Sequence, residues 1–298
     1  MGAQLRVYRR RIRSVQATKK ITKAMELIAS SRIIKAQQRL DASLPYLEQL
    51  VSAISAAASH ASDVSKHPLT SQESAGRSAA LLVVTADRGL AGAYSSNAIR
   101  EAESLTRNLT DKGLTVVPYV VGRKGVSFYR FRDRAMGGQY TGFTDQPSYA
   151  DAKAIAEDLL NAFMGEAGVD EIHVVYTQFV NMGTQTTRVR RILPLEVVEE
   201  VIDTSVAGGM PFPLYEFEPS PEAVLDALLP RYIEQMVYLC LLTSAASEHA
   251  ARRRAMKSAT DNAEELIRSL TRQANQARQA EITQEISEIV GGADALSA

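Results

Sequence analysis

The sequence contains only one cysteine, Cys240, and no tryptophan. A single cysteine can form neither an internal disulfide nor a cysteine-based metal site. Cys240 lies in the apolar run MVYLCLLTSAA, which favours a buried, unreactive side chain, and the lack of disulfides is typical of a reducing, cytoplasmic compartment. Aromatic residues make up 6% of the chain, which suggests helices that pack through Ala, Leu and Ile.

Long hydrophobic runs are also absent. No apolar stretch approaches the roughly 20 residues of a membrane-spanning helix, and residues 1–13 are basic without the apolar segment of a secretion signal. We therefore expect no direct insertion into a membrane. The four histidines have no metal-ligand spacing; we expect His173 to be structural, and His60, His67 and His249 to be solvated. The sequence predicts no metal, no cofactor and no catalytic residue.

The net charge is zero, but the charges are unevenly distributed along the chain. Residues 1–40 hold eleven Lys and Arg against one acid, Glu26, so their net charge is +10. Residues 41–230 have a net charge of −9, and residues 231–298 of −1. So basic a segment points to nucleic acid, an anionic membrane surface or an acidic protein partner.

The N-terminal part of the chain has the pattern of one long helix, over residues 3–58. Apolar or small side chains recur every three or four positions, and Pro45 is expected to bend the helix without ending it. Residues 18–37 have two apolar stripes: Ile21, Met25 and Ile28 form one, and Thr22, Ala29, Ile33 and Ala36 form the other. A helix that packs only on its own domain has one stripe, so this helix is expected to have two contact faces.

The C-terminal part predicts a second long helix. Residues 231–290 contain no helix breaker, and Gly291 with Gly292 are expected to end the helix. Pro230 predicts a bend or break near Leu229. Two such helices predict an antiparallel coiled coil formed by residues 1–58 and 222–298.

Between the helices the pattern changes to short β-branched runs that alternate with helical segments. Such alternation predicts an inserted Rossmann-like α/β domain over residues 70–215, flanked by linkers at 59–78 and 203–221. The expected strands are 79–86, 115–122, 171–179 and an edge strand at 186–195, and the expected helices are 95–109 and 148–162. The fold class is therefore α/β with long terminal helices.

Two glycine-containing turns follow the first two expected strands, where phosphates often bind. The turn with Gly89 and Gly92 lacks the three-glycine dinucleotide pattern, and no Gly-Lys-Ser/Thr follows it. The turn with Gly122 and Gly125 fails in the same way. We expect these glycines to serve tight strand-to-helix turns, and the isolated chain neither to bind nor to hydrolyse ATP.

Three stretches resemble the γ subunit of bacterial F-type ATP synthases. They are IRSVQATKKITKAMELIASSR near the N-terminus, DRGLAGAYSSN in the insert, and AMKSATDNAEELI followed by NQARQAEITQEISEIVGGA near the C-terminus. The resemblance covers essentially the whole chain and is loosest between about residues 130 and 220. It implies a central rotor shaft that is not itself an enzyme. Such a shaft couples ion-driven rotation of the c-ring to ATP synthesis and hydrolysis in the surrounding ring of α and β subunits.

The resemblance also implies the partners: the α and β subunits, the ε subunit and the c-ring, with no nucleic acid. The protein would be peripheral to the cell membrane, on its cytoplasmic side. One stripe of the first helix would pack on the C-terminal helix and the other would face the ring. An acidic loop of the family's β subunits would suit the basic residues 1–40.

Five residues match the family's contact positions for the ring. Met25 matches the methionine beside the acidic β loop, and Arg278 and Gln279 match the pair that engages a catch loop of a β subunit. Thr283 and Glu285 match coupling positions. No apolar side chain larger than Ala occurs in residues 271–281, which favours hydrogen-bonded contacts with a partner.

Glu218 in FEPSP matches the position that faces the polar loops of the c-ring. The chain departs from the family in residues 89–93, where Ala91 replaces a frequent cysteine, so no redox role can be placed there. The plant-plastid insert with its paired regulatory cysteines is also absent.

Two other functions were considered. A basic coiled-coil nucleic-acid-binding protein would explain residues 1–40, but neither the α/β insert nor the polar C-terminal segment. An α/β enzyme with helical oligomerisation arms would need a catalytic constellation, which the sequence lacks. Co-purification with α, β and ε subunits would separate a rotor shaft from a nucleic-acid binder.

Overall fold

The computed structural model describes residues 2–61, 67–70, 78–165, 168–195 and 216–297. In chain order the elements are α1 (Gly2–His60), β1 (Ser78–Val84), α2 (Tyr94–Asp111), β2 (Thr115–Val121), α3 (Arg123–Phe131), β3 (Gly138–Tyr140), α4 (Tyr149–Met164), β4 (Glu171–Phe179), β5 (Gln185–Leu193) and α5 (Pro221–Ser297). They form two compact units. Unit 1 comprises residues 1–30 and 252–298, and unit 2 comprises residues 31–251.

The long terminal helices and the α/β insert are confirmed. Helix α1 has 59 residues and contains Pro45 without interruption. Helix α5 has 77 residues, and the stop expected at Gly291 and Gly292 was wrong, because the helix continues through them to Ser297. Of the bend or break expected near Leu229, the break is excluded, since the helix is continuous through Pro230. A glycine inside a helix costs about 1 kcal/mol relative to Ala, which weakens a helix without requiring it to end.

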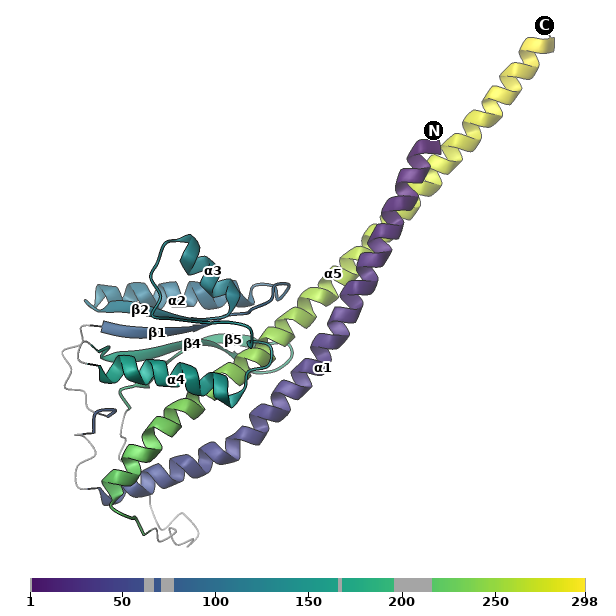
Figure 1. The fold of residues 1–298 in the computed structure, drawn as a ribbon. Helices are drawn as coiled ribbons and strands as arrows, with labels where there is room; N and C mark the ends of the chain where they lie inside the picture. The colour runs from purple at the N-terminus through teal and green to yellow at the C-terminus, as the bar shows by residue number, and fades with distance from the viewer. Residues whose placement is uncertain (1, 62–66, 71–77, 166–167, 196–215, 298) are drawn as a thin grey trace. The chain divides into compact units, whose positions relative to one another are not determined.

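Unit 2 contains a five-stranded sheet in the order β3-β2-β1-β4-β5 (Figure 1). The first four strands are parallel, and β5 pairs antiparallel with β4 at the edge, where the sequence predicted an edge strand. The strands and helices expected in the insert lie within about two residues of their observed bounds. Helix α3 and the three-residue β3 were not predicted.

The sheet is covered on both faces (Figure 1). Leu82 and Val84 of β1 point to one face, where they pack in a common core with Leu159 of α4 and Leu241 of α5. The alternate residues of β1 pack on the opposite face, against Ala102 of α2. Because successive side chains of a strand point to opposite faces, one apolar run serves both layers. The core of the insert is thus shared with α5.

Helix α5 also completes the hydrogen bonding of β4. Strand β1 pairs with β4 only as far as Val175, and beyond it three hydroxyls of α5 take over. Ser244 Oγ accepts from Thr177 N–H at 3.2 Å, and Thr243 Oγ1 accepts from Phe179 N–H at 3.0 Å. Ser247 Oγ donates to Thr177 O at 2.9 Å. These serine and threonine side chains satisfy buried backbone groups that a further strand would otherwise pair.

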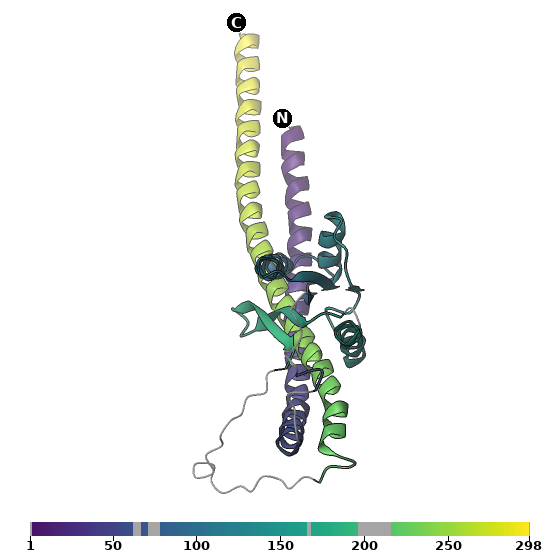
Figure 2. The same cartoon turned by 90° about the vertical axis from the view of Figure 1, so that its left-hand side faces the viewer.

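Unit 1 is an antiparallel pair of helical segments from α1 and α5, which lie side by side in Figures 1 and 2. Thr22 Oγ1 and Thr260 Oγ1 are 2.7 Å apart and hydrogen-bonded, and Lys19 Nζ lies 3.1 Å from Glu264 Oε2. The pairing runs in opposite directions along the two segments. The unit boundary cuts α1 after Ser30 and α5 before Arg252, and the predicted domain boundaries stay a prediction.

Candidate subunit-contact surfaces

The seam between the two helices of unit 1 is made mostly of small and polar side chains. Thr22, Ala29, Thr260 and Ala263 are all less than one tenth exposed, and Met256 is the largest apolar side chain near them. The Thr22 hydroxyl also bonds Lys19 O, and that of Thr260 bonds Met256 O. This part of the seam removes little apolar surface from water, so it provides little of the hydrophobic stabilisation that burial gives. Further along the pair, Leu270 of α5 is 6% exposed.

The outer surface of unit 1 carries large apolar side chains. Ile21 and Ile28 are 60% and 54% exposed, and Leu27 beside them is 60% exposed. By contrast, every residue of the other stripe is less than one tenth exposed: Thr22, Ala29, Ile33 and Ala36. The packed face of α1 is therefore confirmed. The other stripe is left to solvent, and its contact with a partner stays a prediction. Contiguous exposed apolar residues of this kind mark interaction surfaces.

The same segment of α1 is strongly basic on its solvent side. Its exposed cations are Arg6, Arg9, Arg10, Arg11, Arg13, Lys20 and Lys23, and Lys19 is half-buried in the ion pair with Glu264. Glu26 is only 8% exposed and accepts from Lys23 Nζ at 3.1 Å. The one acid of the segment is thus used internally, and the outer surface presents positive charge together with Ile21 and Ile28.

The four predicted contact residues of α5 all lie in solvent. Arg278, Gln279, Thr283 and Glu285 are exposed. At 1.5 Å per residue in both helices, the Thr22–Thr260 pair places the first turn of α1 beside roughly residue 280 of α5. Figure 1 shows α5 continuing beyond the N-terminal end of α1. The predicted residues therefore lie where the helix pair ends and α5 continues as a single helix.

The single-helix segment exposes both polar and apolar side chains. Arg278 and Glu285 are seven residues apart and share a face, and Gln279 and Thr283, four apart, share another. Exposed apolar residues are interleaved with them: Ile282, Ile286 and Ile289 are 46%, 56% and 71% exposed. Ile282, Ile286 and Ile289 follow the i, i+4, i+7 spacing of one helical face, and an apolar stripe that is left in solvent is suited to contact with a partner.

The other two predicted contact residues are also accessible, but in different places. Met25 is half-buried in unit 1, next to the exposed Ile21 and Ile28 in the helical repeat. Glu218 is exposed in unit 2, immediately before α5. The structure thus places five of the six residues in unit 1 and one in unit 2.

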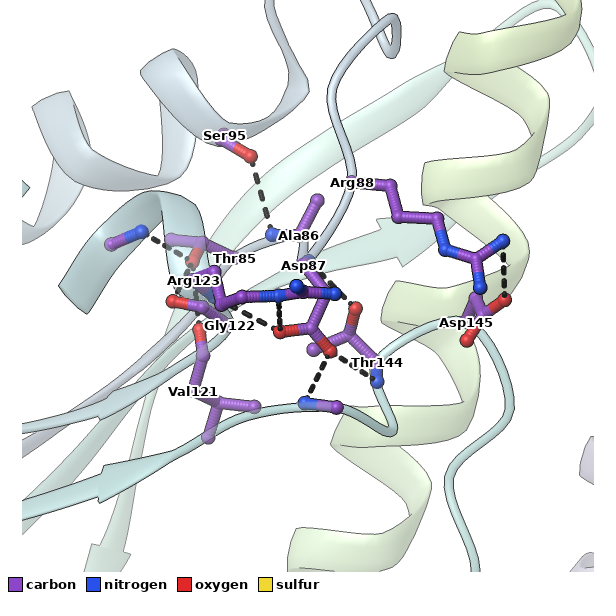
Figure 3. A network of polar contacts seen from close by, with 12 residues as sticks. Thr85, Ala86, Asp87, Arg88, Ser95, Val121, Gly122, Arg123, Thr144 and Asp145 are labelled. Carbon is purple, nitrogen blue, oxygen red and sulfur yellow. Dashed lines mark hydrogen bonds and ion pairs between the residues drawn. The ribbon is translucent and has the colours of Figure 1, made fainter. Parts of the chain in front are cut away.

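In the α/β unit, the carboxylate of Asp87 joins three loops (Figure 3). Its Oδ1 accepts from Arg123 N–H at 3.1 Å, and its Oδ2 accepts from Gly142 N–H at 2.7 Å and Thr144 N–H at 3.1 Å. Burial alone would raise the pKa of Asp87, but these N–H groups together hold it below its usual value. The DRG signature of the resemblance therefore has a structural role here, which the sequence did not reveal.

The N-terminus of α3, the second phosphate-like turn, is filled by the chain's own acceptors. Arg123 N–H donates to Asp87, Lys124 N–H to Ala86 O at 3.0 Å, and Gly125 N–H to Thr85 Oγ1 at 2.9 Å. A Cβ at Gly125 would lie 2.7 Å from Val120 Cγ1, so this glycine serves close packing. The Asp87 carboxylate accepts from Arg123 N–H at the helix N-terminus, where a bound anion would otherwise sit. The turn therefore has a structural role.

Two histidines were wrongly expected to be solvated. The side chain of His67 is only 15% exposed, and its Nε2 lies 2.9 Å from Asp226 Oδ1. His249 is 1% exposed, and its Nε2 is hydrogen-bonded to Asp145 O at 2.9 Å. The carboxylate of Asp145 pairs with Arg32 of α1 and, at 3.8 Å, with Arg88. A helix that docks on a sheet buries its polar residues as well as its apolar ones, provided that they find partners. His173 is buried and bonded to Glu171, as expected of a structural histidine.

Other kinds of site find no support in the described ranges. They contain no group of three or more His, Cys, Asp or Glu residues that could hold a metal ion. The same ranges contain no helix with the length and apolarity needed to cross a membrane. Cys240 is 3% exposed, and burial raises the pKa of its thiol to about 12, so the thiol is unreactive at neutral pH.

Comparison with known proteins gives a full-length match. The family model described as ATP synthase matches residues 4–296. The ATP synthase gamma chain of Acidothermus cellulolyticus is 64% identical over 301 residues, covering 100% of this chain and 99% of its own. That of Kineococcus radiotolerans is 61% identical over 300 residues, covering 100% and 98%.

Solved structures share the fold. Chains from two cryo-EM structures of Euglena gracilis mitochondrial ATP synthase, one described as OSCP/F1/c-ring in rotational state 3 and one as the rotor in rotational state 1, match with TM-scores of 0.68 and 0.65. They are 14% and 15% identical, and the matches cover 99% and 95% of this chain and 95% and 100% of theirs. At these identities the likeness is one of fold alone, and the sequence matches decide the family. The chain belongs to the ATP synthase gamma chain family.

Proposed function

We propose that this chain is the central rotor shaft of an F-type ATP synthase. As a gamma chain it is a non-catalytic subunit, and it couples rotation of the c-ring to conformational changes in the surrounding α and β subunits. The observation that carries this proposal is the surface of unit 1. Its helix α1 leaves Ile21 and Ile28 in solvent on a segment that is rich in exposed cations. A pair of helices with this surface needs a partner around it.

The basic outer surface of α1 supports contact with acidic parts of the ring. Exposed arginines can hold carboxylates by two parallel hydrogen bonds while they turn past successive partners. Met25 lies between the exposed Ile21 and Ile28 in the helical repeat, which supports a contact with an acidic loop of a β subunit through the apolar part of this surface. We assign Met25 and its apolar neighbours to this contact.

The exposed residues of the single-helix segment support a second contact with the ring. Arg278 and Gln279 offer seven N–H donors between them, because a guanidinium has five and an amide two. We assign this pair to a catch loop of a β subunit, and Thr283 and Glu285 to coupling contacts further along the helix. Polar contacts of this kind can be made and broken at each rotor angle without exposing a large apolar surface.

The remaining contacts are proposed from the family alone. Glu218, exposed before α5, is assigned to the polar loops of the c-ring, and the ε subunit is assigned to the stalk. The chain would then be a peripheral protein on the cytoplasmic side of the cell membrane, in a complex that transports ions. We further propose that residues 1–58 and 222–298 form the coiled-coil shaft and that residues 70–215 form the inserted domain.

The mechanism follows from the asymmetry of this surface. A rotor can shift the conformations of its partners only through interactions that differ between them. The sides of unit 1 differ in charge and apolarity, so three β subunits around it would each meet a different side and be biased to a different nucleotide affinity. The catalytic chemistry belongs to the ring.

Single-cysteine labelling tests the proposal, because the buried Cys240 gives an unreactive background. Maleimide should modify an Ile28→Cys variant of the free chain rapidly, and the complex assembled with α and β subunits slowly. Lys153→Cys, in the exposed side of α4, is the matched control and should react equally fast in both. Equal labelling of Ile28→Cys before and after assembly would contradict the proposal.

The alternative of a nucleic-acid-binding protein has no support in the comparisons. It makes a distinct prediction: duplex DNA, instead of α and β subunits, would protect Ile28→Cys from maleimide. The same labelling experiment therefore separates the two functions.

A further inference from the structure

The C-terminal end of α3 carries an exposed aromatic and basic patch that the rotor function does not use. Phe131 is 89% exposed, the highest value among the large apolar side chains of the described residues. Three arginines and two half-exposed apolar side chains lie around it in the sequence. The Phe131 patch is defined as Phe128, Arg130, Phe131, Arg132, Arg134 and Met136.

The base of the patch is held by the packing of unit 2. Phe128 and Met136 pack against Val120 and Tyr129, and the rings of Phe128 and Tyr129 meet edge to face with centroids 5.4 Å apart. The Arg132 guanidinium carbon lies 4.3 Å above the centroid of the Phe128 ring. Such a cation–π contact orients the guanidinium. The patch is therefore preorganised, which lowers the entropy cost of binding.

The positive charge of the patch is only partly balanced. Arg134 Nη1 lies 2.6 Å from Glu103 Oε1, and Arg132 Nη1 lies 3.8 Å from the other oxygen of the same carboxylate. Arg130 Nη2 donates to Gln139 Oε1 at 3.0 Å, which is a neutral acceptor. One carboxylate of α2 thus serves two guanidinium groups, and the third is paired with an amide.

We propose that the Phe131 patch binds an acidic segment of a protein partner. An apolar side chain of that segment packs on Phe131, and its carboxylates pair with Arg130 and Arg132. Aromatic residues and arginine are the side chains most enriched at the energetic centres of protein interfaces, and a guanidinium matches a carboxylate in geometry. The surface is distinct from the residues assigned to the ring and the c-ring.

A protein segment is favoured over a membrane or a nucleic acid because acidic groups lie within the patch. Asp133 is exposed between Arg132 and Arg134, and Glu103 lies beside both. A dense array of phosphates would meet these carboxylates and be repelled. Carboxylates on a flexible chain can pair with Arg130 and Arg132 and avoid Asp133.

Photo-crosslinking in the cells that make the protein tests this inference. The full-length chain is expressed with Phe131→p-benzoylphenylalanine, the cells are irradiated, and crosslinked peptides are identified by mass spectrometry. We expect crosslinks to one protein segment rich in Asp and Glu. The matched control is the same replacement at Met164, 65% exposed at the end of α4, which should give no such crosslink.

Arginine variants give the second arm of the test. Arg130→Gln with Arg132→Gln should lower the crosslinking yield about tenfold, since each exposed charge pair contributes a fraction of the binding energy. Arg100→Gln with Arg107→Gln, on the exposed side of α2, should leave the yield unchanged. The proposal would be overturned if no crosslink formed, if the crosslink were to lipid or nucleic acid, or if replacing Arg130 and Arg132 left the crosslinking yield unchanged. A chain that fails to assemble with α and β subunits but keeps the crosslink would contradict only the rotor function.

Discussion

The two units of this chain are built by opposite means. In unit 2 the sheet buries Leu81, Leu82 and Val83 completely, and the backbone groups that β1 leaves unpaired on β4 are bonded by hydroxyls of α5. In unit 1 the middle of the seam consists of small residues such as Thr22 and Ala29 beside Met256, and Ile21, Leu27 and Ile28 are exposed. Unit 2 is therefore stabilised by a large core of its own, whereas unit 1 buries less and leaves apolar surface available to partners.

Hydrogen exchange on the free chain should show the largest difference between the units. Amides of β1 and β4 should exchange only through global unfolding, which costs on the order of 5–15 kcal/mol in ordinary domains. Amides of residues 19–30 should exchange through local opening at a small fraction of that cost, because their seam buries little apolar surface. Mass spectrometry after deuterium labelling measures both in one sample. If the amides of residues 19–30 and of β1 exchanged equally slowly in the free chain, the two units would not differ in stability as argued.

In the assembled complex, the exposed pair Arg278 and Gln279 should matter for turnover. Replacing both with Ala keeps or improves helix propensity, so the fold should survive. Each lost hydrogen bond that involves the charged group costs roughly 1.5–3 kcal/mol, so the ATPase rate per assembled complex should fall about tenfold or more. Assembly is checked by gel filtration.

The chain offers a matched control for that pair. Arg272 and Gln273 are the same two residue types, also exposed on α5. Replacing them with Ala should leave turnover close to that of the unmodified complex. Wild-type turnover in the Arg278→Ala, Gln279→Ala complex, or an equal loss in both pairs, would refute the assignment of the catch contact.

Core truncation should affect the stability of unit 2 only. Leu159→Ala removes a side chain that is 0% exposed between α4 and the sheet, and it should cost about 2–5 kcal/mol of the free energy of unfolding. Ile28→Ala, at a residue 54% exposed, should change stability by about 0.5 kcal/mol or less. Urea unfolding of the free chain gives both values. A loss for Ile28→Ala as large as that for Leu159→Ala would mean that unit 1 is packed in the free chain.

Asp87 should give a smaller, pH-dependent effect. Asp87→Asn places an amide opposite N–H donors of Arg123, Gly142 or Thr144, and it should cost about 1.5–3 kcal/mol. Because the folded-state pKa of Asp87 lies below its unfolded value, the carboxylate stabilises the fold above the unfolded pKa. That contribution is lost as the pH falls through the folded pKa.

The pH profile of unfolding checks the sign. The difference between wild type and Asp87→Asn should be constant at neutral pH. It should shrink as the pH falls from the unfolded pKa of about 3.9 through the lower folded pKa, because the unfolded chain takes up the proton first. Asp111→Asn, at an exposed position at the end of α2, serves as the control and should leave the profile unchanged. A difference that grows as the pH falls would contradict the role given to Asp87.

Much of the fold could be predicted from local patterns, and the failures have physical reasons. The β-branched runs that became β1, β2 and β4 and the alternation that became β5 are strong local signals. Helix α3 has nine residues with Gly125 inside, so it looked like a turn. His249 was expected in solvent because a polar residue in a long helix usually is; its burial depends on docking to Asp145, a contact about a hundred residues away in sequence.

The candidate site was predictable in its surface but not in its partners. The double stripe around Met25 and the lack of large apolar side chains from 271 to 281 indicated surfaces that the chain itself would not cover, and α1 and α5 confirm this exposure. The partner residues proposed to contact Arg278 belong to another chain, so this sequence could not identify them. The role of Asp87 was missed because one carboxylate in a turn has no local signal that it joins three loops.

Two hydroxyl deletions should give the smallest effects and sharpen the contrast between the units. In unit 2, Ser244→Ala leaves the buried Thr177 N–H without its acceptor, which should cost about 1–3 kcal/mol in urea unfolding. In unit 1, Thr22→Val removes one partner of Thr260, but the Thr260 hydroxyl keeps Met256 O as an acceptor. Its cost should be about 0.5–1.5 kcal/mol, seen only as faster hydrogen exchange near residue 22. Thr22→Val with Thr260→Val should be no worse than the single variant, because no buried polar group is then left alone. If the double variant instead costs more than the Ser244→Ala variant, the threonine pair holds the helices of unit 1 together, and the view that unit 1 depends on its surroundings is wrong.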